Sequence, residues 1–269
     1  MKKDKSLEKW INELQQSGRY WFTQDQALSV LQYSKKTISM SIYRLVQKNR
    51  VMNIKSGFYV IVPIEYSYQG TLPPTWFMHD LMKYLNYDYY VGLLSAASFH
   101  GAAHQAPQIF QIITERTLKR IEIKNMSIHF YRNKWVTQVP TLMKRTPTGD
   151  IKVSTPAATA FDLIKYMSSS GGLSNVPTVL SELIESIKPK ELTNIINSFL
   201  YDRADVQRLG FLFDQKEIGG QKLAKEIYEV SKKIYSFRNT LLNSHSIQKT
   251  GNIDQKWCIV INDVVEVEV

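Results

Sequence analysis

The sequence has 269 residues, of which 43% are hydrophobic and 12% aromatic, and its formal net charge is +10. This is the composition of a globular protein, which excludes disordered and fibrous classes, and no apolar run approaches the ~18–20 residues that a membrane span needs. A single cysteine, Cys258, excludes an intrachain disulfide framework and a cysteine-rich zinc site. Because the N-terminus is charged and no apolar signal segment follows it, we expect a cytoplasmic protein.

The positive charge is concentrated at the start of the chain. Up to Gly70 there are eleven Lys and Arg residues against five Asp and Glu residues. An excess of this kind in one quarter of a protein is expected for a nucleic-acid module attached to a second unit.

The first 66 residues read as three helices followed by a hairpin. Apolar spacing predicts a helix over residues 6–16, a capping box at Thr23 begins a short second helix, and Ser34 is the expected N-cap of the third. The predicted segments are a helix over 6–16, a short helix after Thr23 with Ala27, Leu28 and Leu31 inward, a helix over 35–48, the strands 51–54 and 58–62, and between the strands the turn Lys55-Ser56-Gly57. This order predicts a winged helix-turn-helix.

The third helix has the pattern of a recognition helix. Ile38, Ile42, Leu45 and Val46 form an apolar stripe, and the opposite arc is polar and basic. Hydroxyl and cationic side chains there can reach phosphates and base edges, and the hairpin tip can touch the neighbouring backbone. The predicted DNA-contacting residues are Ser34, Lys35, Lys36, Thr37, Ser39, Met40, Tyr43, Arg44, Gln47, Lys55 and Ser56. The alternatives are an ordinary solvated helix face and a winged helix that binds protein.

Residues 67–269 are predicted to form a larger α+β domain, with a small sheet and several helices. A proline-bounded connector, residues 63–74, is expected to pack on this domain. The predicted elements are a helix over 76–85, a buried small-residue helix over 89–103, strands over 109–114, 121–123, 127–131 and 151–154, helices over 157–167, 176–187, 190–201, 205–213 and 221–235, and a final strand within 257–269. Gly210 is read as a helix stop, with Arg208 beside the C-terminal end of the helix dipole.

The sequence contains few residues in patterns typical of catalysis. His100 and His104 are one helical turn apart, a spacing that suits a metal, but the residue after His100 is glycine where a zinc protease would have glutamate. Asp162 is a candidate carboxylate for which no partner stands out, and Cys258 is read as a small core residue. We therefore expect no metal site, no cofactor and no enzymatic activity.

Four short blocks, in order, resemble the AbiEi antitoxins of type IV toxin–antitoxin systems, which act in abortive infection. They are Ser95-Ala96-Ala97 with His100-Gly101-Ala102-Ala103-His104-Gln105 and Pro107-Gln108, then Thr155 to Leu163, then Gly171-Gly172-Leu173, and then Gln207 to Leu212. The last ~30 residues match no block. The resemblance implies an antitoxin that represses its own operon by binding inverted repeats in double-stranded DNA through its N-terminal domain. It also implies a C-terminal domain that counters a nucleotidyltransferase-like toxin without a stable complex.

Two other hypotheses stay open at this point. One is a winged-helix regulator whose C-terminal domain senses a ligand near Tyr87, Tyr89, Tyr90 and Phe99; the other is a metal hydrolase or a nuclease-like enzyme. A second basic segment is either a solvated sheet edge or a further surface for DNA or RNA. Its cations are Arg116, Lys119, Arg120, Lys124, Arg132, Lys134, Lys144 and Arg145.

Overall fold

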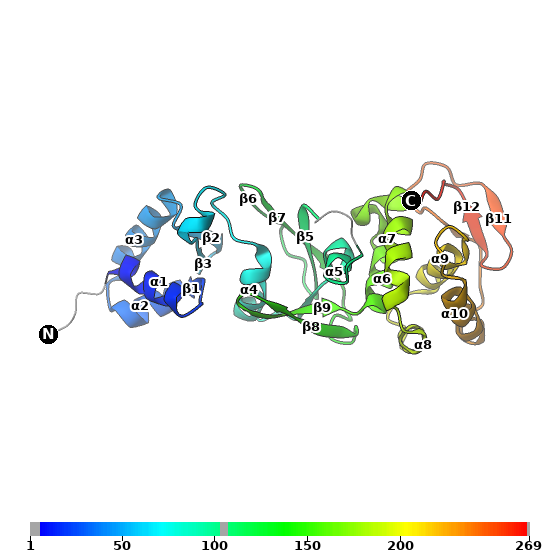
Figure 1. Cartoon of the computed structure of the whole chain (residues 1–269), viewed down its shortest axis with the longest axis horizontal. Coiled ribbons are helices and arrows are strands. Elements are labelled where there is room, and N and C mark those ends of the chain that lie inside the picture. Colours follow the sequence, from blue (N-terminus) through cyan, green and yellow to red (C-terminus); the bar gives the residue numbers. More distant parts are fainter. Residues whose placement is uncertain (1–5, 103–106, 268–269) are drawn as a thin grey trace.

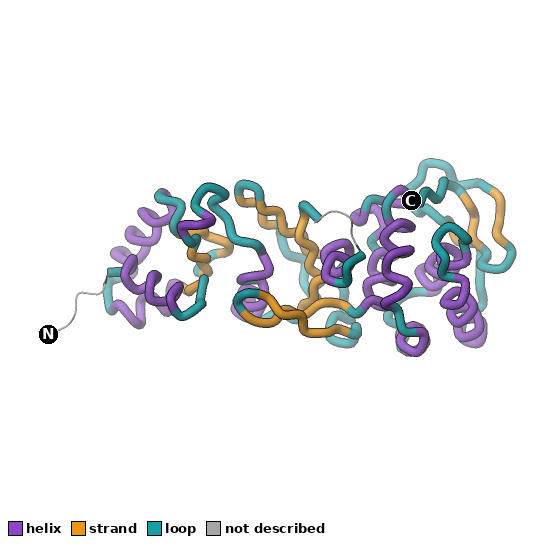
Figure 2. Tube along the Cα trace, viewed as in Figure 1, coloured by secondary structure: helices purple, strands orange, loops and turns teal. Residues whose placement is uncertain are grey.

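The chain forms an elongated α+β molecule with three apolar cores along its long axis (Figure 1). The computed structural model describes residues 6–102 and 107–267. Figure 2 shows helices gathered at both ends and strands between them, with a small sheet beside the N-terminal helices and another beside the C-terminal helices. Within the described residues, no helix is long and apolar enough to cross a bilayer.

The N-terminal end contains three helices and a three-stranded antiparallel sheet in the order β1-β3-β2. The elements are α1 (Leu7–Gln16), β1 (Trp21–Thr23), α2 (Gln24–Leu31), α3 (Lys35–Gln47), β2 (Val51–Lys55) and β3 (Phe58–Ile61). The capping box at Thr23 and the N-cap at Ser34 are confirmed. Strand β1 was not predicted, because three residues are too few to show an alternating pattern.

Successive residues of a strand point to opposite faces of a sheet. In the N-terminal sheet both faces carry apolar side chains, and each face is covered by a different core. Val51 and Ile61 pack with the three helices, whereas Phe58 and Val60 belong to the second core, together with helix α4 (Met78–Leu85). The Phe58 ring lies 5.4 Å from that of Tyr84 on α4. The N-terminal end is therefore packed onto the rest of the molecule rather than tethered to it.

The connector contains two short 3-10 helices, η1 (Ile64–Tyr66) and η2 (Pro74–Trp76). The rings of Tyr66 and Trp76 meet at 5.5 Å and pack against the second core, as expected of a connector that does not swing freely.

The central sheet has six strands in the order β6-β7-β5-β4-β9-β8, with β5–β7 and β4–β9 parallel and the other pairs antiparallel. The strands are β4 (Tyr89–Val91), β5 (Ile109–Thr114), β6 (Ile121–Ile123), β7 (Met126–Arg132), β8 (Thr141–Thr146) and β9 (Gly149–Ser154). Strand β8 was not predicted, since none of its six residues is buried and its sequence is mostly polar.

The predicted buried helix over residues 89–103 is wrong. The segment begins as the buried strand β4, turns at Gly92 and continues as helix α5 (Leu93–Phe99). A Cβ at Gly92 would lie 2.6 Å from the Ile113 side chain, so the glycine there permits close approach to β5. The small residues after it do pack closely, in a helix half the expected length.

The C-terminal end is mostly helical. Its helices are α6 (Pro156–Lys165), η3 (Met167–Ser170), η4 (Gly172–Ser174), α7 (Val176–Leu183), η5 (Ile184–Ser186), α8 (Pro189–Asn197), α9 (Arg203–Asp214) and α10 (Gln221–Ile234), and its strands are β10 (Thr240–Leu241), β11 (Asn252–Asp254) and β12 (Ile259–Ile261). The tail was predicted as one strand; only β12 is extended there, and β10 and β11 were missed. Cys258, predicted to be a core residue, is half-buried with φ of 53°.

Gly210 does not stop a helix, contrary to prediction. It lies inside α9, where a Cβ would come within 2.1 Å of the Trp257 ring. Arg208 is also not at a helix end: it pairs with Asp205 at 3.5 Å and donates to the Leu241 carbonyl at 2.9 Å. The glycine is therefore needed for the C-terminal tail to pack on α9.

Gly210→Ala is expected to destabilise the protein. The added methyl group overlaps a fully buried indole, and overpacking of this kind costs about 1–3 kcal/mol. Urea unfolding followed by circular dichroism measures the change. Trp257→Leu in the Gly210→Ala background should recover part of the loss, and a Gly210→Ala variant as stable as the parent would contradict the packing described.

Candidate nucleic-acid interface

Helix α3 has one buried and one exposed face, as predicted. Ile38, Ile42 and Leu45 are buried against α1 and the sheet, and Val46 is half-buried. All the predicted contact residues from Ser34 to Gln47 are exposed: Ser34, Lys35, Lys36, Thr37, Ser39, Met40, Tyr43, Arg44 and Gln47. At 1.5 Å per residue this face is roughly 20 Å long, and an α-helix fits the width of the DNA major groove.

Few contacts occupy the side chains on this face. Ser34 accepts a hydrogen bond from the Thr37 backbone N–H at 3.2 Å and contacts the Thr37 hydroxyl at 2.8 Å, and Gln24 donates to the Ser39 hydroxyl at 2.9 Å. Among the described residues, none forms an ion pair with Lys35, Lys36 or Arg44. These three cations remain available to an outside anion.

The hairpin tip is less free than the helix. The Tyr84 hydroxyl donates to the Ser56 carbonyl at 3.1 Å, and a Cβ at Gly57 would lie 2.5 Å from the same hydroxyl. Lys55 is half-buried and Ser56 exposed. The tip is thus held against α4, and only its side chains remain able to reach a ligand.

The second basic segment does not form one surface. Arg116, Lys119 and Arg120 lie between β5 and β6, Lys124 in the β6–β7 turn, Arg132 and Lys134 at the end of β7, and Lys144 and Arg145 on β8. Strands β6 and β8 are opposite edges of the sheet, roughly 24 Å apart at about 4.8 Å per strand. The eight cations therefore divide into separate groups.

One of these cations meets the N-terminal end. Lys124 Nζ donates to Asn49 Oδ1 at 2.8 Å, just beyond the end of α3. Elsewhere in the group, Arg120 pairs with Glu122 at 3.1 Å on the surface. The β6–β7 turn is therefore the part of the second segment that lies near α3.

Two of the described histidines form side-chain hydrogen bonds. His100 Nε2 lies 2.7 Å from the Ser154 carbonyl oxygen, and burial lowers its pKa. His79 Nδ1 lies 3.0 Å from the Tyr89 hydroxyl. His104 is outside the described residues, and residues 6–102 and 107–267 contain no group of three or more His, Cys, Asp or Glu that could hold a metal.

Asp162 has partners that sequence reasoning missed. It is fully buried in α6, and its Oδ1 accepts hydrogen bonds from Tyr201 at 2.8 Å and from Tyr90 at 3.2 Å. Burial raises the pKa of Asp162 to about 7, and Oδ2 has no hydrogen-bond partner within the described residues. The tyrosines are 72 and 39 positions away, so no local spacing signals the cluster.

The tyrosines that the sequence suggested for a ligand pocket are separated. Tyr89 packs in the central core and Tyr90 in the C-terminal core, because consecutive residues of β4 point to opposite faces of the sheet. Tyr87 and Phe99 are only partly buried, at the edge of the central core.

Comparison with known protein families assigns the part of the chain that contains the central sheet and the helices up to α9. Residues 90–215 match the AbiEi antitoxin C-terminal domain. This part of the chain, residues 90–215, belongs to the AbiEi antitoxin family. The AbiEi domain runs from β4 to the end of α9, so it includes all four sequence blocks and the Asp162 cluster, and it gives the chain the role of antitoxin in a toxin–antitoxin pair.

The fold of this chain is similar to that of a solved protein. The crystal structure of the RV2827C protein from Mycobacterium tuberculosis superposes with a TM-score of 0.66 at 14% sequence identity, covering 93% of this chain and 89% of that one. The likeness extends over the whole fold, including the N-terminal end that lies outside the family match. No curated protein matches the sequence.

Proposed function

We propose that this antitoxin also represses its own operon, binding inverted repeats in operator DNA through an N-terminal winged helix-turn-helix, residues 1–66. The observation that carries the proposal is the exposed basic face of α3, with three cations that have no ion-pair partner among the described residues. The order of three helices and a hairpin supports it, because this is the order of elements in winged helices.

The second part of the proposal concerns residues 67–269. Through this domain, the antitoxin counteracts a nucleotidyltransferase-like toxin without forming a stable complex with it. The AbiEi match over residues 90–215 supports this role. The ligand-sensing alternative loses its original basis, since Tyr89 and Tyr90 do not face a common cavity.

Binding of the full chain to duplex DNA from its own upstream region tests the first part. If α3 and its surroundings neutralise about four to six phosphates, the logarithm of the affinity falls with the logarithm of salt concentration with a slope of about −4 to −5. Gel shifts at several salt concentrations, with a scrambled duplex as the control, measure both the slope and the specificity. A flat salt response, or equal binding to the scrambled duplex, contradicts operator recognition.

A further inference from the structure

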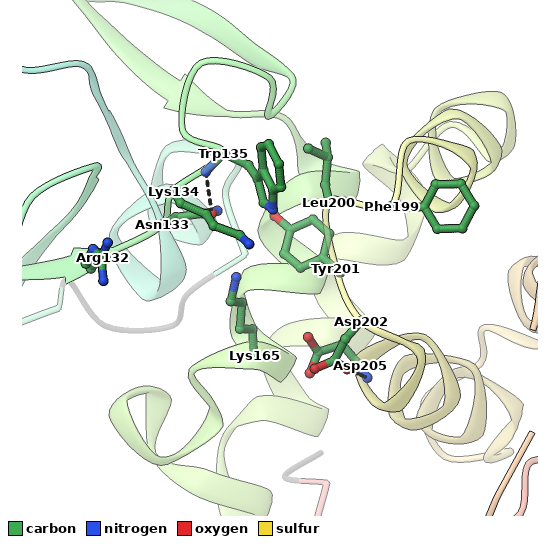
Figure 3. A pocket seen from close by; sticks show the side chains of 10 residues that line it. All are labelled: Arg132, Asn133, Lys134, Trp135, Lys165, Phe199, Leu200, Tyr201, Asp202 and Asp205. Atoms are coloured by element: carbon green, nitrogen blue, oxygen red, sulfur yellow. Dashed lines mark hydrogen bonds between the residues drawn. The ribbon is translucent and has the colours of Figure 1, made fainter.

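A cavity of about 430 Å³ lies inside the AbiEi domain, between the central sheet and the C-terminal helices (Figure 3). Its size is within the ~300–1,000 Å³ of small-molecule sites. The lining residues come from the end of β7 and the loop after it, from α6, and from the α8–α9 connection: Arg132, Asn133, Lys134, Trp135, Lys165, Phe199, Leu200, Tyr201, Asp202 and Asp205.

Two ammonium groups converge in this cavity. The side chains of Lys134 and Lys165 approach from different elements and point toward one another (Figure 3). In the described part of the chain, neither has a carboxylate within 4.0 Å; Lys134 lies over the Trp135 ring at 4.8 Å and Lys165 over the Tyr201 ring at 5.5 Å. The Asp162 and Asp205 carboxylates attract Lys165 only from beyond that distance. Two ammonium groups that face each other with no carboxylate between them form a place for an anion such as phosphate.

Beside the cations the cavity has an aromatic wall. Trp135 is 38% exposed although it is one of the largest apolar side chains, and the Tyr201 ring is buried next to it. An exposed indole at the edge of a cationic cavity offers a stacking surface for a planar base. Tyr201 is fixed by its hydrogen bond to Asp162, so this wall is rigid.

The remaining wall is acidic. Asp202 and Asp205 lie together, away from Lys134 and Trp135 (Figure 3). Asp205 is already paired with Arg208 at 3.5 Å, and Asp202 Oδ1 accepts a hydrogen bond from the Asp205 backbone N–H at 2.9 Å. Among the lining residues, the cations Arg132, Lys134 and Lys165 therefore outnumber the carboxylate of Asp202, which has no ion-pair partner among the described residues. Carboxylate oxygens accept hydrogen bonds from hydroxyl and amino groups, which a ribose and a base provide.

The geometry points to a binding site for a mononucleotide in the AbiEi domain, with its phosphate between Lys134 and Lys165, its base against Trp135 and its sugar toward Asp202. This site lies outside the α3 face and does not depend on DNA binding.

Calorimetric titration of the full chain with AMP, CMP, GMP and UMP tests the inference. At least one of these should bind with one site per chain, and the matching nucleoside or inorganic phosphate alone should bind at least about tenfold more weakly, since each lacks one set of contacts. Phosphate alone binding as tightly as the nucleotide would overturn the assignment by showing a simple anion site. Absence of binding for all four nucleotides at millimolar concentration would overturn it as well.

Charge-neutral variants locate the site. Lys134→Gln and Lys165→Gln should each weaken nucleotide binding by about tenfold or more, because each loses a charge-assisted hydrogen bond. Lys233→Gln, an exposed cation on α10 outside the cavity, is the matched control and should bind as the parent does. If Lys134→Gln and Lys165→Gln keep the parent affinity, or if all three variants lose it equally, the assignment is wrong. Thermal melting of each variant verifies that it is folded.

Discussion

Replacing Lys36 and Arg44 together by alanine should remove most of the affinity of the protein for its operator. Both side chains are exposed on the same face of α3. An arginine that contacts a base contributes about 1–3 kcal/mol of binding free energy, and loss of a lysine that contacts a phosphate makes the salt slope shallower by about one. We therefore expect the double replacement to cost about 2–4 kcal/mol of binding free energy. Gel shift of the upstream duplex measures the loss, and the slope should become shallower.

A matched pair of substitutions separates this effect from net charge. The double variant Lys225→Ala, Lys233→Ala also removes two positive charges. Both lysines are exposed on α10, at the other end of the molecule (Figure 1). That variant should bind the operator nearly as the parent does. Equal losses in the two double variants would mean that overall charge, rather than the α3 face, carries the binding.

The second large effect concerns stability and pH. Burial raises the folded-state pKa of Asp162 to about 7, whereas an unfolded aspartate titrates near 3.8. Between these values the folded protein holds a proton that the unfolded chain has lost, so stability contributed by this group is present at low pH and is lost as pH rises toward 7. The loss amounts to about 1.4 kcal/mol per pH unit within that window.

Asp162→Asn should remove this dependence, because an amide does not titrate and its oxygen still accepts the bonds from Tyr90 and Tyr201. The stability of the parent relative to Asp162→Asn should therefore fall by about 2–3 kcal/mol between about pH 5 and about pH 8, as measured by urea unfolding. Asp88→Asn, at an exposed position before β4, is the matched control for the loss of one carboxyl group. Parallel pH profiles for the parent and Asp162→Asn would show that the carboxyl is ionised in the folded protein.

The three N-terminal helices and the hairpin could be predicted because their signals are local, whereas the short strand β1 was missed. A hydroxyl at each of Thr23 and Ser34 begins a helix, and the apolar stripe of α3 fixes which side faces the core. The same stripe also determines which side chains remain exposed, so the candidate interface could be found without a structure.

The features that were missed depend on distant contacts. Gly210 looks like a helix stop until Trp257, far along the chain, is seen to occupy the space above it. The segment after Tyr89 has helical composition, but pairing with β5 makes its first residues a strand. The partners of Asp162, and the convergence of Lys134 with Lys165, are likewise set by how α6 meets the sheet.

The central claim is that operator binding and toxin neutralisation are separate activities at opposite ends of one protein. It is tested most directly by growth of cells that express the toxin together with the Lys36→Ala, Arg44→Ala variant, with the variant made from an inducible promoter at the parent's level. We expect growth equal to that with the parent antitoxin, although the variant should bind the operator much more weakly. Loss of growth rescue by this folded, equally abundant variant would contradict the account.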